Sequence, residues 1–529
     1  MINKFIYIPL PNTPPFSVFI KEKNQAIKMK TYTYLFSIIL IISFYRCSSK
    51  EIIQLPITTS SPEALEYYKR AMLSYQVGDV IECNEDLKLA LSVDPNFAMA
   101  LEFYQSQNQR ENIEFQLKAK SQFQNISEAE QKIISIRESY REGNMDKALE
   151  NAKWLVDNHG DSYESYVWLG LVQSDRYELD DAILSLKKAI ELNKDSYNAY
   201  NLLMGHHIGA GEQVMLPADK RDVELGMKYG DELIRIRGDH GYPYHFKANV
   251  YRQLGQFEKA KPLYEKSIEK RKGRSSEPTA YLVSGHNYMF SGDLETARKR
   301  YNRAIELEKE PNWKFVLSFY LTVSHIFDND YYGALDNINK VEKGLSLYNF
   351  DEVSLLSRKR DISWQKLVCY AHNQMEEEAY GALSDQVKYN KMRAKLLNDD
   401  NVFRNVKSFE EYLTAWVNIL FGKYEVAKKN LITLRGLQEK INDPTAMHGY
   451  HHLLGLTHLM EGNYEAAVEN FKKGDETDIY FNYFKGLSLK AAGENIAAEK
   501  IFTDIININF AAWDLAIVKK LAQKQLGET

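Results

Sequence analysis

Apolar and polar residues follow one another along most of the chain with the spacing of paired amphipathic helices. In the first helix of each pair, a large aromatic residue precedes a small residue by four positions, so both lie on one helix face. The pairs are Tyr166 and Gly170, Tyr244 and Ala248, and Tyr281 and Gly285. A small residue at this place lets a second helix approach closely, so the pattern predicts helix-turn-helix hairpins.

The turn and the second helix repeat as well. A glycine followed two positions later by a bulky residue marks the turn, as in Gly255 with Phe257 and Gly292 with Leu294. Glycine ends a helix well because it adopts the left-handed conformation without steric cost. The second helix then places alanine at the closest crossing, at Ala148, Ala182, Ala260, Ala297, Ala427, Ala467 and Ala498.

This pattern extends over nearly all of residues 63–510 and predicts about ten hairpins. The expected units begin near Ala64, Ala129, Tyr163, Tyr197, Gly241, Pro278, Phe315, Arg360, Ser408, His448 and Ile479. Residues 97–127 have a helical pattern without the repeated motif and are interpreted as a degenerate unit. The unit at Tyr197 holds about ten extra residues between its helices.

The spacing resembles that of the tetratricopeptide repeat, whose length is about 34 residues. The resemblance implies an all-α fold, an α-α superhelix (solenoid) of tetratricopeptide-type hairpins, which acts by holding other proteins. The expected division of the chain is 1–28 as a mis-assigned start or disordered extension, 29–47 as a signal peptide, 48–62 as a linker, 63–388 as a first block of repeats, 389–407 as a polar break, 408–510 as a second block, and 511–529 as a polar-faced capping helix.

In this family, the first helices of successive hairpins line a concave groove. At the corresponding positions the middle units carry aromatic residues mixed with hydrogen-bonding ones, which predicts a partner-binding surface at Tyr242, His245, Phe246, Asn249, Arg252, Leu282, His286 and Phe290. Only Asn249 and Arg252 suit the carboxylate clamp of the chaperone-binding members, so that mode is excluded. The competing interpretation is that these side chains pack inside the array. If the binding site lies elsewhere, the insertion Gly211–Asp222 is the next candidate.

The start of the chain resembles an export signal. Met29 and Lys30 precede an apolar run from Tyr34 to Tyr45, which is too short for an ordinary membrane span of about 20 residues. Cys47 follows with small polar residues, and this resembles a bacterial lipoprotein signal, in which Cys47 would be lipidated. Arg46 departs from that pattern, so another exported or anchored form and a cytoplasmic protein remain alternatives.

Composition narrows the class of function. The chain has 529 residues, only 13 prolines, and a net charge of −5 from 67 basic and 72 acidic residues. This near balance argues against general nucleic-acid binding, which usually needs a strongly basic domain. The three cysteines, Cys47, Cys83 and Cys369, are too few for a disulfide-stapled fold, and Cys83 is expected to pack as a small apolar residue.

Motifs for catalysis are not found in the sequence. It contains no phosphate loop, no GxSxG and no HExxH. His448, His451 and His452 share a helix face in part, but no carboxylate completes a ligand set. We therefore expect no enzyme activity, no cofactor and no metal site.

The main hypothesis is an exported, lipid-anchored scaffold of the cell envelope that docks protein partners and binds no nucleic acid. A regulatory or sensor protein in the cytoplasm or at the inner membrane is the alternative from another class. A third, weaker alternative is an extracellular protein that binds an oligosaccharide or a peptide.

Overall fold

The computed structural model describes residues 52–105, 109–208, 216, 220–348, 350–397, 400–440 and 445–527. Within this part the secondary structure is entirely helical, as the sequence predicts. The predicted signal peptide and Cys47 lie outside the described residues, as does most of the insertion Gly211–Asp222.

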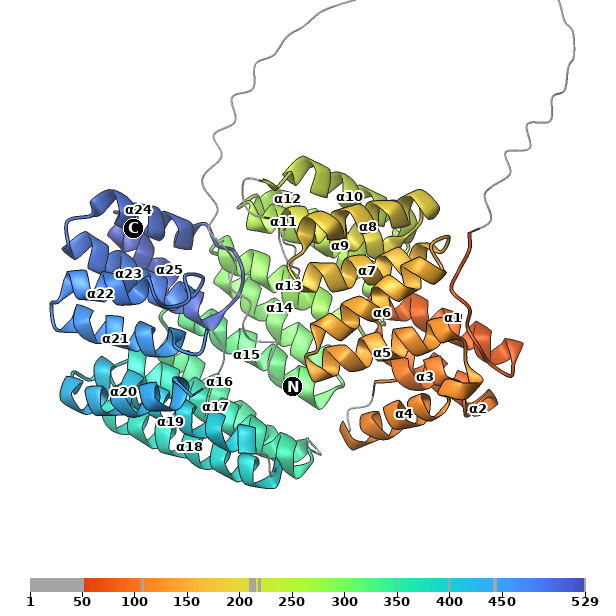
Figure 1. Ribbon diagram of the computed structural model, residues 1–529. Coiled ribbons are helices and arrows are strands. Elements are labelled where there is room, and N and C mark those ends of the chain that lie inside the picture. Colours follow the sequence, from red (N-terminus) through yellow and green to blue (C-terminus); the bar gives the residue numbers. More distant parts are fainter. Residues whose placement is uncertain are drawn as a thin grey trace, which may run out of the picture.

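Helices that follow each other pack as antiparallel hairpins, and the described part contains twelve of them followed by a single last helix (Figure 1). The first six hairpins are α1 (Pro62–Tyr75) with α2 (Val80–Val93), α3 (Ala98–Phe103) with α4 (Gln109–Ser121), α5 (Glu128–Glu142) with α6 (Met145–Asn158), α7 (Tyr163–Asp175) with α8 (Leu179–Leu192), α9 (Tyr197–Ile208) with α10 (Val223–Arg237), and α11 (Tyr242–Gln253) with α12 (Phe257–Arg271).

The second half continues in the same way. Its elements are α13 (Glu277–Phe290) with α14 (Leu294–Leu307), α15 (Pro311–Phe327) with α16 (Tyr331–Gly344), α17 (Glu352–His372) with α18 (Glu376–Leu397), α19 (Asp400–Leu420) with α20 (Tyr424–Gln438), α21 (His448–Met460) with α22 (Tyr464–Phe471), α23 (Ile479–Ala491) with α24 (Asn495–Ile506), and the last helix α25 (Trp513–Gln525). Short 3₁₀ turns are η1 (Phe123–Asn125) and η3 (Leu345–Leu347). The degenerate unit at 97–127 is the hairpin of α3 and α4.

Small residues hold each hairpin together. A Cβ on Gly285 would lie 2.5 Å from Cε1 of Tyr301, and one on Gly170 would lie 2.7 Å from Leu186. Gly455 meets Phe471 in the same way. Each glycine therefore faces a bulky residue sixteen positions later, on the second helix of the same hairpin. The predicted crossing residues are buried there, and Cys83 is also buried.

The polar break predicted at 389–407 is wrong. Residues up to Leu397 complete α18, and α19 begins at Asp400, so the segment forms the ends of two long helices. Asn390 and Ala394, one helical turn apart, are buried, while the many charged residues around them face solvent. One hydrophobic cluster includes buried residues on both sides of this segment, from Leu282 to Leu383 and from Leu413 to Ala522.

The chain curls back on itself in its second half. Helix α25 packs against α24 and α23, and it also packs against α15, which lies far earlier in the sequence (Figure 1). The residues predicted to form a polar-faced cap are therefore enclosed on several sides: Leu515, Ala516, Ile517 and Val518 are all buried. Among the described helices, none is both long and apolar enough to cross a membrane.

Candidate functional site

The eight residues predicted to bind a partner lie on α11 and α13, as their spacing requires. The structure brings them together: the ring centroids of Tyr242 and Phe246 are 4.5 Å apart, and the ring of His245 stacks on Phe246. Tyr242 and Phe290 are partly buried, whereas the others are buried: His245, Phe246, Asn249, Arg252, Leu282 and His286.

Arg252 binds the chain's own C-terminal segment. Its Nε donates a hydrogen bond to the backbone carbonyl of Asn509 (3.1 Å), and its Nη1 donates to the hydroxyl of Tyr264 (3.1 Å). Tyr264 in turn donates to Oδ1 of Asn249 (2.7 Å). The side-chain amide of Asn509 donates to the backbone carbonyl of Gln253 (3.3 Å). The pair Asn249 and Arg252 thus shares a face as predicted, and what it contacts is internal.

Lys519 of α25 also contacts Asn509. Its Nζ donates to the backbone carbonyl of Ile508 (2.5 Å) and to Oδ1 of Asn509 (2.9 Å), and it lies 5.1 Å from the ring centroid of Phe290. Burial disfavours the charged amine and lowers the pKa of Lys519 to about 7. Burial also raises the pKa of Asp514, on the same helix, to about 6.

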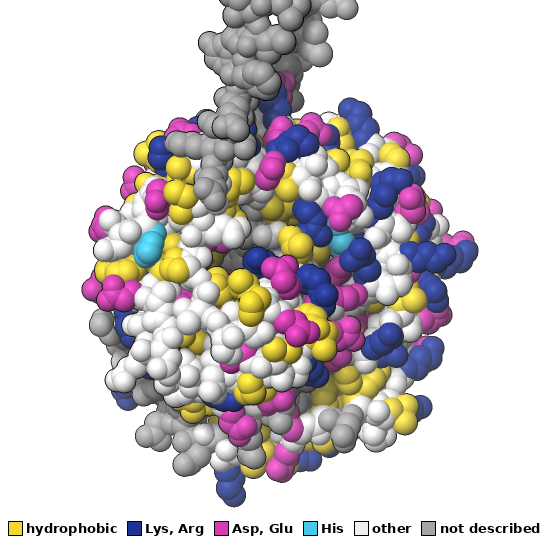
Figure 2. All heavy atoms as spheres, turned by 90° about the vertical axis from the view of Figure 1, so that its right-hand side faces the viewer, with side chains coloured by type: hydrophobic (Ala, Val, Ile, Leu, Met, Phe, Trp, Pro, Cys, Tyr) yellow, Lys and Arg dark blue, Asp and Glu magenta, His cyan; other side chains and the backbone are white. Residues whose placement is uncertain are grey.

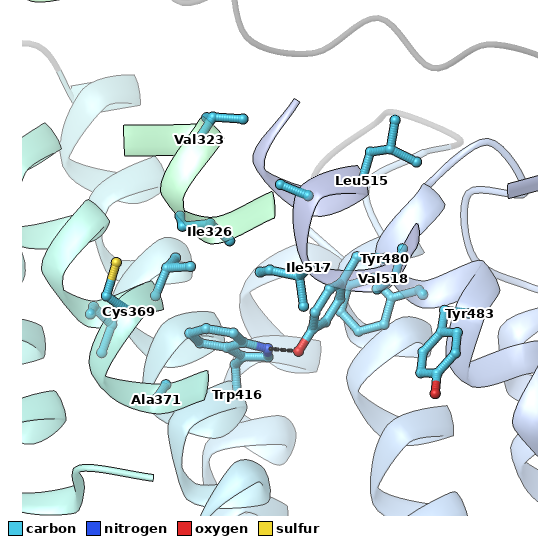
Figure 3. Close-up of a cluster of buried hydrophobic side chains, with 14 of the residues drawn as sticks. Val323, Ile326, Cys369, Ala371, Trp416, Tyr480, Tyr483, Leu515, Ile517 and Val518 are labelled. Carbon is cyan, nitrogen blue, oxygen red and sulfur yellow. Dashed lines mark hydrogen bonds between the residues drawn. The ribbon is translucent and has the colours of Figure 1, made fainter. Parts of the chain in front are cut away.

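Buried side chains of α15, α17, α19, α23 and α25 form a hydrophobic cluster in the second half (Figure 3). Trp416 of α19 donates from Nε1 to the hydroxyl of Tyr480 on α23 (3.3 Å). Ile517 and Val518 of α25 lie beside them, and Ile326 of α15 and Cys369 of α17 complete the cluster. Helix α25 is therefore packed within the second half, against α15, α23 and α24.

An open binding surface at the eight predicted residues is thus wrong for the folded chain. Six of them are buried, and the packing interpretation describes them correctly. Arg252 is covered by its contact with Asn509, 257 positions away. Phe246 packs in a cluster with Val77 and Tyr197, and His286 packs against Tyr301 and Tyr320. The sequence feature that could have indicated the contact of Arg252 with Asn509 is the stretch from Ile505 to Val518, because it is too apolar for a helix that faces solvent.

The histidine cluster shows no ligand geometry. His452 stacks on Phe481 and hydrogen-bonds through Nε2 with the backbone carbonyl of Asp475 (3.2 Å), while His451 pairs with the side chain of Asn470. Among the described residues, no group of three or more His, Cys, Asp or Glu side chains could hold a metal ion.

A second surface, which sequence reasoning missed, lies at the other end of the array. Residues 52–60, called here the strap, were predicted to be part of a linker, but they run in an extended conformation past the N-terminal ends of α1, α5 and α7. Leu55 is 5% exposed and joins the hydrophobic cluster of the first hairpins, with Ile57 packed against it. The linker prediction is therefore wrong for this segment.

Three carboxylates, called here the acidic edge, hold the strap: Asp94, Glu130 and Glu164. The amide of Leu55 donates to Glu164 (2.6 Å), and the amide and hydroxyl of Thr58 donate to Glu130 (2.8 and 2.6 Å).

Asp94 holds the end of the strap nearest α1. The hydroxyl of Thr59 and the amide of Ser60 both donate to it, at 2.7 and 2.8 Å. Burial alone would raise the pKa of Asp94, but these hydrogen bonds keep it below its ordinary value. Burial dominates at Glu164 and raises its pKa.

The outer surface carries both signs of charge. On the face shown in Figure 2, Lys and Arg side chains are interspersed with Asp and Glu, and hydrophobic side chains lie between them. Many charged side chains pair along or between helices, such as Lys366 with Glu342 and Arg300 with Glu265. This face offers no extended basic track of the kind that binds a nucleic-acid backbone.

Comparison with known proteins identifies the repeats in the middle of the chain. The family model of the tetratricopeptide repeat matches residues 242–269 and 278–311, which cover α11 to α14. No curated protein matches the sequence.

Several solved structures are similar to parts of the chain. A crystal structure of MamA is 25% identical, covering 32% of this chain and 91% of that chain, with a TM-score of 0.26. A tetratricopeptide repeat protein from Parabacteroides merdae is 12% identical, covering 56% and 98%, with a TM-score of 0.31. The APC/C hetero-tetramer Cut9-Hcn1 gives 13% identity, coverage of 83% and 75%, and a TM-score of 0.34.

Proposed function

We propose that this tetratricopeptide-repeat protein is a non-enzymatic scaffold for other proteins, exported from the cytoplasm and attached to a membrane through a lipid on Cys47. The observation that carries the scaffold is the family match on α11 to α14, set in an array of hairpins built alike. Proteins with these repeats generally act as interaction scaffolds. Stacked hairpins contact mainly their neighbours and present long surfaces to partners.

Export and anchoring are supported by the sequence. The apolar run from Tyr34 to Tyr45 has the length of a signal-peptide core, and Cys47 follows it after one residue, Arg46. Cys47 precedes Ile52, the first residue of the strap, by five positions. A chain of that length spans at most about 18 Å. A lipid on Cys47 would therefore hold the edge of the array near α7 close to the bilayer surface.

Membrane fractionation of the full chain, expressed in a bacterium, tests the anchor. Cys47→Ser should release the protein from membranes or leave a precursor of higher mass, because no thiol remains for lipidation. Cys83→Ser is the matched control, since Cys83 is buried in the first hairpin and serves packing. Equal fractionation and mass for Cys47→Ser and the parent would contradict the anchor and favour a cytoplasmic regulatory protein.

Cross-linking in intact membranes tests the scaffold. The full chain, carrying a photo-reactive residue at an exposed position of the first hairpins such as Val93, next to Asp94, should form the same protein adducts in repeated preparations. The control places that residue at Tyr177, a loop position that is exposed as well. Adducts that do not differ between the two positions, or no adducts at all, would contradict a specific docking surface.

A further inference from the structure

The strap is seated in the way that extended peptide ligands are. From Gln54 to Ser60 its residues alternate between exposed and at least partly buried, with positions 55, 57 and 59 turned toward the array. This is the two-residue period of an extended chain. Within the described residues, the strap takes part in no helix and no sheet, so its position depends on its side-chain contacts and on the acidic edge.

The hydrogen bonds between the acidic edge and the strap involve mainly the backbone amides of the strap. The amides at positions 55, 58 and 60 donate to Glu164, Glu130 and Asp94 in turn. Main-chain hydrogen bonds with pockets for alternate side chains are a recurring mode of peptide recognition, because any extended segment offers the same amides. The buried side chain of Leu55 supplies the apolar contact, and the hydroxyls of Thr58 and Thr59 add two donors.

The charge of the acidic edge is not neutralised by the strap. The strap supplies only neutral donors, and Asp94, Glu130 and Glu164 form no ion pair in the described part of the chain. Cationic donors make stronger hydrogen bonds to carboxylates than neutral ones do. Three acids at helix ends would by themselves indicate no site; the extended segment seated on them is what indicates the class of ligand.

We propose that the acidic edge is a binding site for an extended segment of a partner protein, which the strap occupies until that segment displaces it. The segment carries an aliphatic residue in the place of Leu55 and hydroxyl or basic side chains in the places of Thr58 and Thr59. The strap joins α1 at Ser61, whose side chain caps that helix through the amides of Glu63 and Ala64. The strap can therefore leave while the first helix stays capped. This inference rests on the proposed scaffold function and assigns a surface to it.

The test measures binding of a fluorescent peptide to the full chain by anisotropy. The probe has the sequence of residues 52–61 with Thr59→Lys. The tethered strap competes at high effective concentration, so the triple variant Leu55→Ser, Thr58→Ala, Thr59→Ala should bind the probe about tenfold or more tightly than the parent. Adding Glu130→Gln should reverse the gain, whereas Glu128→Gln, an exposed neighbour on the same turn, should not.

A second measurement uses the parent chain, in case the triple variant does not fold. Excess probe should speed hydrogen exchange in residues 52–61 and leave α13 unchanged. Equal probe affinity for parent and folded triple variant would overturn the proposal, and so would unchanged exchange under excess probe. A concentration-dependent dimer of the parent, dissolved by the probe, would overturn it in favour of strap exchange between two copies.

Competition separates this proposal from the scaffold function. The protein adducts formed in membranes should decrease when the probe is added. Adducts that form normally and resist the probe would overturn the acidic edge as the docking site while the scaffold function stands. Probe binding without any adduct would contradict the scaffold function and leave the peptide site in place.

Discussion

The glycine at the hairpin crossing gives the sharpest test of the packing. A Cβ added to Gly285 would lie 2.5 Å from Cε1 of Tyr301 and 2.8 Å from Cδ1. Carbon atoms in contact normally lie about 3.5–4.0 Å apart, so ring and Cβ must separate by roughly 1 Å. Tyr301 is fully buried, and its hydroxyl is hydrogen-bonded to Nδ1 of His286 at 2.8 Å. The ring is therefore held in place, and α13 and α14 must move apart.

The expected cost follows from two opposing effects. Overpacking of this kind costs about 1–3 kcal/mol. Replacing a helical glycine by alanine stabilises the helix by about 1 kcal/mol. Gly285→Ala should therefore lower the free energy of unfolding by about 1 kcal/mol. The matched control is Gly381→Ala: Gly381 is exposed within α18, and a Cβ there would meet nothing within 4 Å. That variant should be about 1 kcal/mol more stable than the parent.

Urea unfolding followed by circular dichroism measures both changes. In Gly285→Ala, hydrogen exchange should become faster in α13, α14 and the adjoining hairpins only, because each repeat of such an array contacts mainly its neighbours. A graded series adds a check, since the closest contact of an added Cβ is 3.0 Å at Gly455, and Gly455→Ala should cost less. If Gly285→Ala stabilised the chain as much as Gly381→Ala, the crossing geometry described here would be refuted.

Three further predictions concern the interior. Phe246→Ala should destabilise the chain by about 3–5 kcal/mol in urea unfolding, because the side chain is buried. An unchanged urea midpoint would mean that Phe246 is exposed. The parent should lose stability as pH falls from about 10 to 7, by up to about 1.4 kcal/mol per pH unit, because the unfolded lysine binds a proton at a higher pH than the buried Lys519, whose pKa is about 7. Lys519→Met should remove this loss. An identical dependence of the free energy of unfolding on pH in both proteins would contradict the burial of the amine. The parent should also lose stability as pH rises from about 4 to 6, since the unfolded carboxyl ionises at a lower pH than the buried Asp514, whose pKa is raised to about 6. Asp514→Asn should remove this loss, and an equal pH dependence in both proteins would contradict the burial of the carboxyl.

The hairpins could be predicted from the sequence because their contacts are local. Tyr281, Gly285 and Tyr301 lie within one unit, and the same spacing recurs along the chain, so each repeat supports the interpretation of the next. Helix boundaries were less certain where the motif fades. The charged residues of 389–407 predict a break, yet the buried Asn390 and Ala394 give α18 an inward face.

The surfaces could not be predicted because they depend on contacts distant in sequence. Arg252 meets Asn509, 257 positions away, because the second half curls back, and Leu55 meets Glu164, 109 positions away, because the first hairpins stack side by side. A groove position within one repeat has the same residue pattern whether a partner or the chain's own segment covers it. The strap gave little signal, because a short extended segment with one buried leucine resembles a linker.

Hydrogen exchange of the unliganded full chain tests most directly which surface is free. The structure predicts that α11, α13, α15 and α25 exchange slowly and to a similar degree, because α25 is enclosed by the helices it packs against. It predicts that residues 52–60 exchange faster than these helices, since the strap belongs to no helix and is held at the edge of the array by hydrogen bonds to three carboxylates. Rapid exchange throughout α25 together with slow exchange in the strap would contradict this structure, because the face of α15 that α25 covers would then be open and the acidic edge permanently covered.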